Sequence, residues 1–249
     1  MVDKQKFFTL NKDIMISETY IKKIDSTINV LEQFEISLEK LLEKYEQQEM
    51  PDSKINRKVF FQTICEKKIT KEQKSYMENK LKKLQHFRDR REPFEYGIDL
   101  ILGWIIEDCI LEILKKFKIE AELSGNDRYR EFLHPKKIST QPDIKIKTKE
   151  KIEKPLEIMC SLQGTWNKKG HVDLRASKYN KLIDHKSLFL GIEPASSFGF
   201  FFDFDKDNDQ NDWVKTHIPG YGGKEGFTNN NIKKHLITFK DILSIFENL

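Results

Sequence analysis

Two acidic residues, Asp143 and Glu157, have the type and spacing needed to hold a divalent cation. Asp143 follows Pro142 at the start of one strand-like segment, and Glu157 lies inside the next one, at 155–161. If a hairpin joins these segments, they form neighbouring strands about 4.8 Å apart, and both carboxylates can meet at one sheet edge. Two carboxylates that are forced together repel each other unless a cation lies between them. Their hard oxygen atoms suit Mg²⁺ or Mn²⁺, and such an ion can polarise a phosphodiester and activate water.

The segments around these acids predict a sheet with helices packed against it. Residues 94–117 are apolar nearly all round and predict a long buried helix. The order of the elements predicts an α/β (α+β) domain at 93–249, with a central mixed β-sheet flanked by helices. From the periodicity of the apolar residues we expect strands at 118–123, 143–148, 155–161, 187–192 and 198–204, a hairpin turn at 149–154, and helices at 175–183 and 239–247.

The N-terminal region, residues 1–92, is expected to be helical. Apolar residues recur at spacings of three and four over 17–49, 57–67 and 70–90, with charged residues between them. We expect this region to clamp a nucleic acid or to form a dimer interface.

Composition excludes several classes of protein. The chain has 249 residues and a net charge of +4, from 44 Lys and Arg against 40 Asp and Glu. No apolar run approaches the roughly 18 residues that a membrane span needs, and the first residues lack the order of a signal peptide, so we expect a cytoplasmic protein without a membrane partner. Cys65, Cys109 and Cys160 show no CxxC spacing, so neither a disulfide framework nor a structural zinc site is expected.

Pro142-Asp143 followed by Glu157-Ile158-Met159 resembles the motif of the PD-(D/E)xK nuclease superfamily, and within it the type II restriction endonucleases. The resemblance covers roughly residues 94–205, with a long helix before the motif and a helix-strand unit after it. It implies a restriction-endonuclease-like fold in which Asp143, Glu157 and the backbone carbonyl of Ile158 bind the metal. An acid on the preceding helix often assists in this family. Glu107 is the candidate, because an acid in a buried apolar helix needs a cationic partner.

The sequence departs from the family at one position, because Met159 stands where the motif has Lys. A thioether cannot orient the attacking water. The predicted helix at 175–183 can supply a lysine instead, and Lys178 is the first candidate. Gln163, beyond the end of the strand, is the second. Lys168 or Lys169 in the intervening loop, and a catalytically inactive site, are the remaining alternatives.

Basic and polar residues outside the acids are candidates for DNA contacts. Arg128 and Arg130 lie in a charged segment at 124–132, and the segment 218–231, rich in Gly and Asn, predicts a flexible loop. An exposed connection and an ordinary surface loop explain these two segments nearly as well. The complete set of candidates is Arg128, Arg130, Lys168, Lys169, Arg175, Tyr221, Lys224 and Asn229.

The resemblance implies a type II restriction endonuclease, which cleaves double-stranded DNA at a specific sequence by Mg²⁺-dependent hydrolysis of phosphodiester bonds. Mn²⁺ is expected to substitute for Mg²⁺. A palindromic recognition site favours a homodimer, and a cognate DNA methyltransferase is expected in the same system. The alternatives are a DNA repair or junction-resolving nuclease of the same fold and a catalytically inactive DNA-binding protein.

Overall fold

The computed structural model describes residues 16–83, 91–125, 127–132, 141–206, 211–219 and 222–249. Its α-helices are α1 (Glu18–Gln33), α2 (Leu38–Leu42), α3 (Arg57–Cys65), α4 (Lys71–Lys83), α5 (Pro93–Lys116), α6 (Thr165–Lys169), α7 (Ala176–Asp184) and α9 (Phe239–Asn248). Its strands are β1 (Glu120–Leu123), β2 (Ile144–Lys147), β3 (Glu153–Cys160), β4 (Val172–Arg175), β5 (Leu188–Glu193), β6 (Phe198–Asp203), β7 (Trp213–Ile218), β8 (Lys224–Asn229) and β9 (Ile237–Thr238).

The strands form a six-stranded sheet in the order β1-β2-β3-β5-β6-β9 and a three-stranded sheet in the order β4-β8-β7. In the larger sheet β3 and β5 are parallel, and the other neighbours are antiparallel. Mixed pairing with helices on the sheet confirms the expected α/β (α+β) class. The connection from β3 to β5 contains α6, β4 and α7, and β7 and β8 lie between β6 and β9 in the sequence, so two separate segments of the chain build the smaller sheet.

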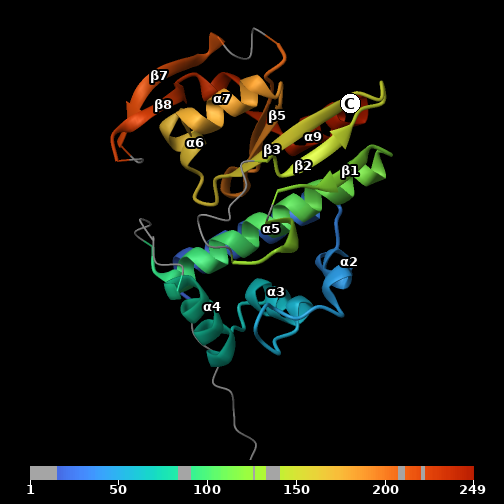
Figure 1. The fold of residues 1–249 in the computed structure, drawn as a ribbon, viewed down its shortest axis with the longest axis vertical. Coiled ribbons are helices and arrows are strands. Elements are labelled where there is room, and N and C mark those ends of the chain that lie inside the picture. Colours follow the sequence, from blue (N-terminus) through green and yellow to red (C-terminus); the bar gives the residue numbers. More distant parts are fainter. Residues whose placement is uncertain (1–15, 84–90, 126, 133–140, 207–210, 220–221) are drawn as a thin grey trace, which may run out of the picture.

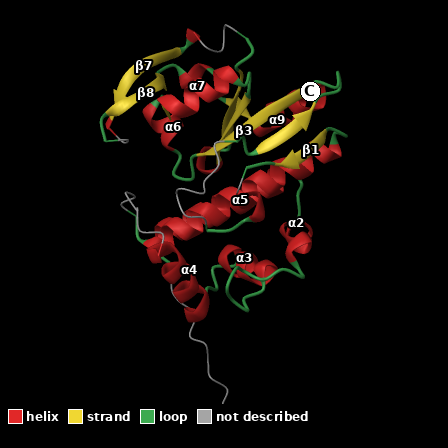
Figure 2. Cartoon of the chain, in the orientation of Figure 1, coloured by secondary structure: helices red, strands yellow, loops and turns green. Residues whose placement is uncertain are grey.

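Helix α5 lies between the larger sheet and helices α2, α3 and α4 (Figure 1), which explains why it is apolar on all sides. Helices α2, α3 and α4 lie on one side of α5 and the strands on the other (Figure 1, Figure 2). One hydrophobic cluster runs from α1 through α5 to Leu156 and Ile158 of β3 and to Phe246 of α9. The N-terminal helices therefore share a core with the sheet.

A second, aromatic cluster covers the other face of the larger sheet. It joins Phe189 of β5 and Phe202 of β6 to Tyr179 of α7 and Trp213 of β7. Strand β5 has both faces covered, and every residue in it is buried. A strand that is buried on both faces reads as a continuous apolar run, as residues 187–192 do.

The structure corrects two expected elements. The helix predicted over 17–49 is interrupted, because Glu35 adopts a positive φ of 55° and the chain restarts at α2, whose N-terminus Ser37 caps. Apolar periodicity continues across the break since α1 and α2 bury their faces in the same core. The loop predicted over 218–231 contains strand β8, which pairs with both β4 and β7. Within the described part of the chain, no helix is long and apolar enough to cross a membrane.

Candidate acidic site at the ends of strands β2 and β3

Asp143 and Glu157, here called the acid pair, occupy adjacent positions on neighbouring strands. Strands β2 and β3 are antiparallel, with Ile144 opposite Leu156. One further step in this register brings Asp143 opposite Glu157, and the Cβ atoms of such cross-strand neighbours are about 4.5–5.5 Å apart. The Asp143 side chain turns towards β3, where its Oδ2 accepts a hydrogen bond of 2.7 Å from the Ile158 backbone N–H. The hairpin therefore places Asp143 and Glu157 at neighbouring positions of β2 and β3.

Lys178 of α7 forms an ion pair with one member of the acid pair: its Nζ contacts Oε1 of Glu157. Glu157 is only 15% exposed and Lys178 is 37% exposed. Leu156 and Ile158 face the core that contains α5, so the alternation of the strand turns Glu157 towards α7. Met159 packs against the aromatic cluster, so the position of the motif lysine is used for packing. The structure thus brings a lysine to Glu157 from α7.

Burial and two neighbouring acids both act on the Asp143 carboxyl. Burial raises the pKa of this carboxyl well above the usual range, and the charges of Glu157 and Glu107 raise this pKa further. Lys178 and the Ile158 N–H oppose these effects only in part. The charge of Glu107 on α5 therefore reaches Asp143, while its role in metal binding stays a prediction. Glu107, Asp143, Glu157 and Lys178 are together called the acidic site.

The cationic partner expected for Glu107 is Arg130. Its Nη1 donates to Oε2 of Glu107 at 2.5 Å and its Nη2 donates to Oδ1 of Asp108 at 2.7 Å. Burial alone would raise the pKa of Asp108, but the charges of Arg130 and Lys44 hold it below the usual range. Arg130 is 1% exposed, which corrects the expectation that it contacts DNA: its guanidinium is turned inwards because two buried acids hold it.

Two residues near the acidic site were not anticipated from the sequence. Burial raises the pKa of the Cys160 thiol, and the charges of Glu107 and Asp143 raise it further. Asp108 shares Arg130 with Glu107. The sequence signal for Asp108 is present, because two consecutive acids in a buried apolar helix require buried cations.

The donor set of the acid pair fits a hard divalent cation. Mg²⁺ commonly binds through one or two carboxylates and retains several waters. The Ile158 carbonyl adds an oxygen, since the N–H and C=O of one strand residue point towards the same edge and the N–H points to Asp143. Among the described residues, no three or more His, Cys, Asp and Glu side chains are grouped to hold a metal. Burial and the charges of Glu157 and Glu107 raise the pKa of Asp143, and a bound cation would oppose these effects.

The other candidates divide between the surface and the interior. Gln163 is exposed in the turn between β3 and α6, whereas Lys178 already contacts Glu157. Asn229 is fully buried and its Oδ1 accepts from the Asn231 N–H, so the expectation that it reads DNA bases is corrected. Tyr221 lies outside the described residues. The exposed candidates are Arg128, Lys168, Lys169, Arg175 and Lys224.

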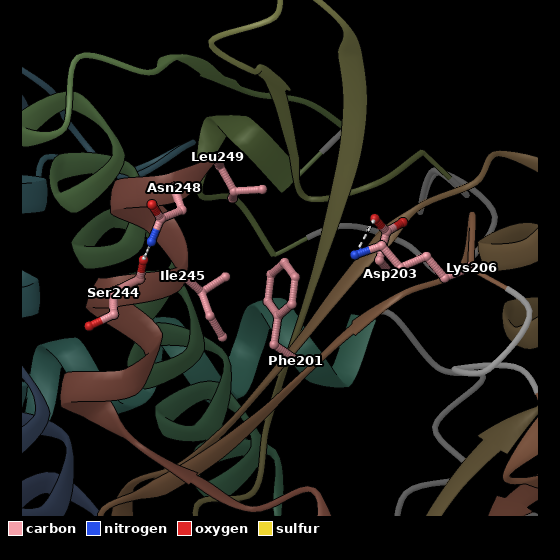
Figure 3. A pocket seen from close by; sticks show the side chains of 7 residues that line it. All are labelled: Phe201, Asp203, Lys206, Ser244, Ile245, Asn248 and Leu249. Carbon is pink, nitrogen blue, oxygen red and sulfur yellow. Dashed lines mark hydrogen bonds and ion pairs between the residues drawn. The ribbon is translucent and has the colours of Figure 1, made fainter.

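A separate open pocket lies between β6 and the C-terminal half of α9 (Figure 3). Its volume is about 400 Å³, and its lining includes Phe201, Ile245 and Leu249. The residues that line it include none of the acidic site.

Comparisons with known proteins add no assignment, because no protein-family model, curated protein or solved structure matches the chain.

Proposed function

We propose that this protein is a Mg²⁺-dependent endonuclease that hydrolyses phosphodiester bonds of double-stranded DNA. More specifically, we propose a cytoplasmic type II restriction endonuclease with a restriction-endonuclease-like fold, acting as a homodimer beside a cognate DNA methyltransferase. The observation that carries the proposal is the ion pair between Lys178 and Glu157, directly beside Asp143. Two acids and a lysine at the end of two strands are the groups that the motif requires, although the lysine comes from α7.

The acid pair and the Ile158 carbonyl would hold Mg²⁺, or Mn²⁺ in its place. When bound, the ion would polarise the scissile phosphate and lower the pKa of an attacking water. The Ile158 N–H holds one oxygen of Asp143 in a defined orientation. Glu107 adds negative charge beside the pair and so favours cation binding.

Lys178 supplies the cationic group that the motif position 159 lacks. Its ammonium is a compact charge on a flexible stem with three donor hydrogens. It neutralises Glu157 in the structure. In the reaction it would orient the attacking water and stabilise the negative charge that develops on the phosphate. The part-exposed position of its side chain leaves it accessible to a DNA phosphate.

Exposed basic residues near α7 would bind the DNA backbone. Lys168 and Lys169 form the last turn of α6, and Arg175 is the residue that precedes α7. Lys and Arg on one surface attract the phosphate backbone by releasing its counterions. We propose that these three residues flank the scissile phosphate.

The experiment is incubation of the purified protein with linear phage DNA and Mg²⁺, read on a gel. Discrete bands support a restriction endonuclease, whereas cleavage confined to branched or damaged DNA would favour a repair or junction-resolving enzyme. Asp143→Asn and Glu157→Gln should abolish cleavage and retain DNA binding. Glu150→Gln, in the exposed turn between β2 and β3, is the matched control and should cleave like wild type. DNA binding without cleavage in Mg²⁺ or Mn²⁺ would refute the enzymatic proposal.

A further inference from the structure

A buried ion cluster connects the N-terminal helices to α5. It consists of Lys44 and Tyr45 from the 3-10 helix after α2, Glu107 and Asp108 of α5, and Arg130. Asp108 has no exposed side-chain surface; Tyr45 Oη donates to its Oδ2 at 2.6 Å, and Lys44 Nζ lies 2.8 Å from its Oδ1. A buried carboxylate is tolerated only with such partners. The N-terminal region therefore holds one end of this cluster.

Arg130 is the member of the cluster that joins Asp108 to Glu107. Its two terminal nitrogens contact one carboxylate each, at 2.7 Å and 2.5 Å. The planar fork of a guanidinium can serve two acceptors at once, whereas the ammonium of lysine is a single point charge. Arg130 also adopts a positive φ of 55°, which a non-glycine residue rarely keeps without support.

The N-terminal helices also hold the backbone beside Arg130. Arg57, at the start of α3, donates from Nη1 to the Tyr129 carbonyl at 2.7 Å and from Nη2 to the Glu49 carbonyl at 3.2 Å. Arg57 is 6% exposed, so this contact is inside the molecule. Tyr129 is therefore fixed to α3, and the guanidinium of Arg130 is fixed to α5.

Arg130 holds Glu107, and the chain just before Arg130 contacts the acid pair, because the N–H of Ser124, directly after β1, donates to the Asp143 carbonyl at 2.9 Å. One oxygen of Glu107 is held by Arg130, while the charge of Glu107 acts on both Asp143 and Cys160. Arg130 thus contacts the one acid of α5 whose charge raises the pKa of Asp143.

We propose that Arg130 is a positioning residue that holds Glu107 beside the acid pair, so that the N-terminal helices are part of the framework of the metal site. This inference rests on the proposed function of that site as a divalent-cation site. It assigns the N-terminal region a role besides clamping DNA or dimerisation.

The test is a double-mutant cycle on Mn²⁺ affinity, measured by titration calorimetry on the full chain without DNA. Arg130→Lys and Glu107→Gln should each weaken Mn²⁺ binding by about 10–100-fold, as the loss of residues that orient metal ligands does. In the Glu107→Gln background, Arg130→Lys should add almost nothing, because it acts through Glu107. Arg91→Lys is the matched control, because Arg91 pairs with Asp99, which lies on α5 as Glu107 does. This variant should bind Mn²⁺ like wild type.

The outcomes separate the inference from the proposed function. Wild-type Mn²⁺ affinity in folded Arg130→Lys, or fully additive losses in the double variant, would overturn the inference and leave the nuclease proposal standing. Wild-type protein that neither binds Mn²⁺ nor cleaves DNA would overturn both. If Arg130→Lys does not fold, Arg57→Lys replaces it, because it loosens the support of Tyr129 and leaves both ion pairs of Arg130 in place. Weaker Mn²⁺ binding by that variant supports the inference, and unchanged binding overturns it.

Discussion

Replacement of Lys178 by Met should slow catalysis strongly without unfolding the protein. The ion pair with Glu157 is part-exposed on the lysine side, at 37%. After allowance for solvent screening, its loss should change the free energy of unfolding by no more than about 1 kcal/mol. A preorganised donor that stabilises charge in the transition state contributes far more, about 10²–10³-fold in rate or about 2.7–4 kcal/mol. The increase in the activation free energy of cleavage should therefore be severalfold larger than the decrease in the free energy of unfolding.

Two measurements on the same preparations separate these effects. Single-turnover cleavage of linear DNA at saturating Mg²⁺ gives the rate, and urea unfolding gives the stability. Lys186→Met removes another exposed ion pair, with Asp205, and should retain the wild-type cleavage rate. A Lys178→Met protein that cleaves at the wild-type rate, or a Lys186→Met protein that loses as much activity, would refute the role of Lys178.

Three further predictions concern charge, packing and DNA contacts. Because the pKa of Asp143 is raised in the folded protein, the folded state binds that proton more tightly, and stability falls as pH rises from the unfolded carboxyl pKa of about 3.9 through the raised value. Without Mg²⁺, Asp143→Asn should therefore unfold at a higher urea concentration than wild type at pH 7, but not near pH 3. An Asp143→Asn protein that is less stable than wild type at pH 7 would contradict the charge argument. A Cβ at Gly191 would overlap the ring of Phe200, whereas one at Gly103 meets open space. Gly191→Ala should therefore lower the free energy of unfolding by about 1–3 kcal/mol, and Gly103→Ala should raise it by about 0.5–1 kcal/mol. Thermal or urea unfolding measures both changes, and equal effects of the two variants would be inconsistent with this packing. Replacing Lys168 and Lys169 by Gln should make the plot of log binding constant against log salt concentration less steep, by the amount that about two phosphate contacts contribute. Filter binding at several salt concentrations measures this slope, and an unchanged slope would exclude both lysines from the DNA interface.

The elements that position the acid pair could be predicted from sequence because their signals are local. Helix α5 agrees with the prediction to within one residue at each end, since its apolar run lies between Pro93 and the lysines of its last turn. The hairpin of β2 and β3 follows from alternation on each side of a charged turn. The contact between Glu157 and Lys178 followed from the order of the strand and the next helix, together with the departure at Met159.

Other features depend on tertiary contacts that no local pattern carries. Arg130 lies in a charged segment typical of an exposed loop, and only its pairing with Glu107 and Asp108 makes burial favourable. Strand β8 has a polar, Gly-containing sequence, and its strand structure depends on pairing with β4 and β7 on both sides. The break at Glu35 could not be predicted from the apolar periodicity, because the helices on both sides of it bury residues in one core.

Cation binding by the acid pair is tested most directly by anomalous diffraction from crystals of the full chain soaked in Mn²⁺. We expect one strong anomalous peak within about 2.0–2.4 Å of carboxylate oxygens of both Asp143 and Glu157, and no such peak in crystals of Asp143→Asn. A fully occupied Mn²⁺ elsewhere, with none between these two side chains, would contradict the central claim.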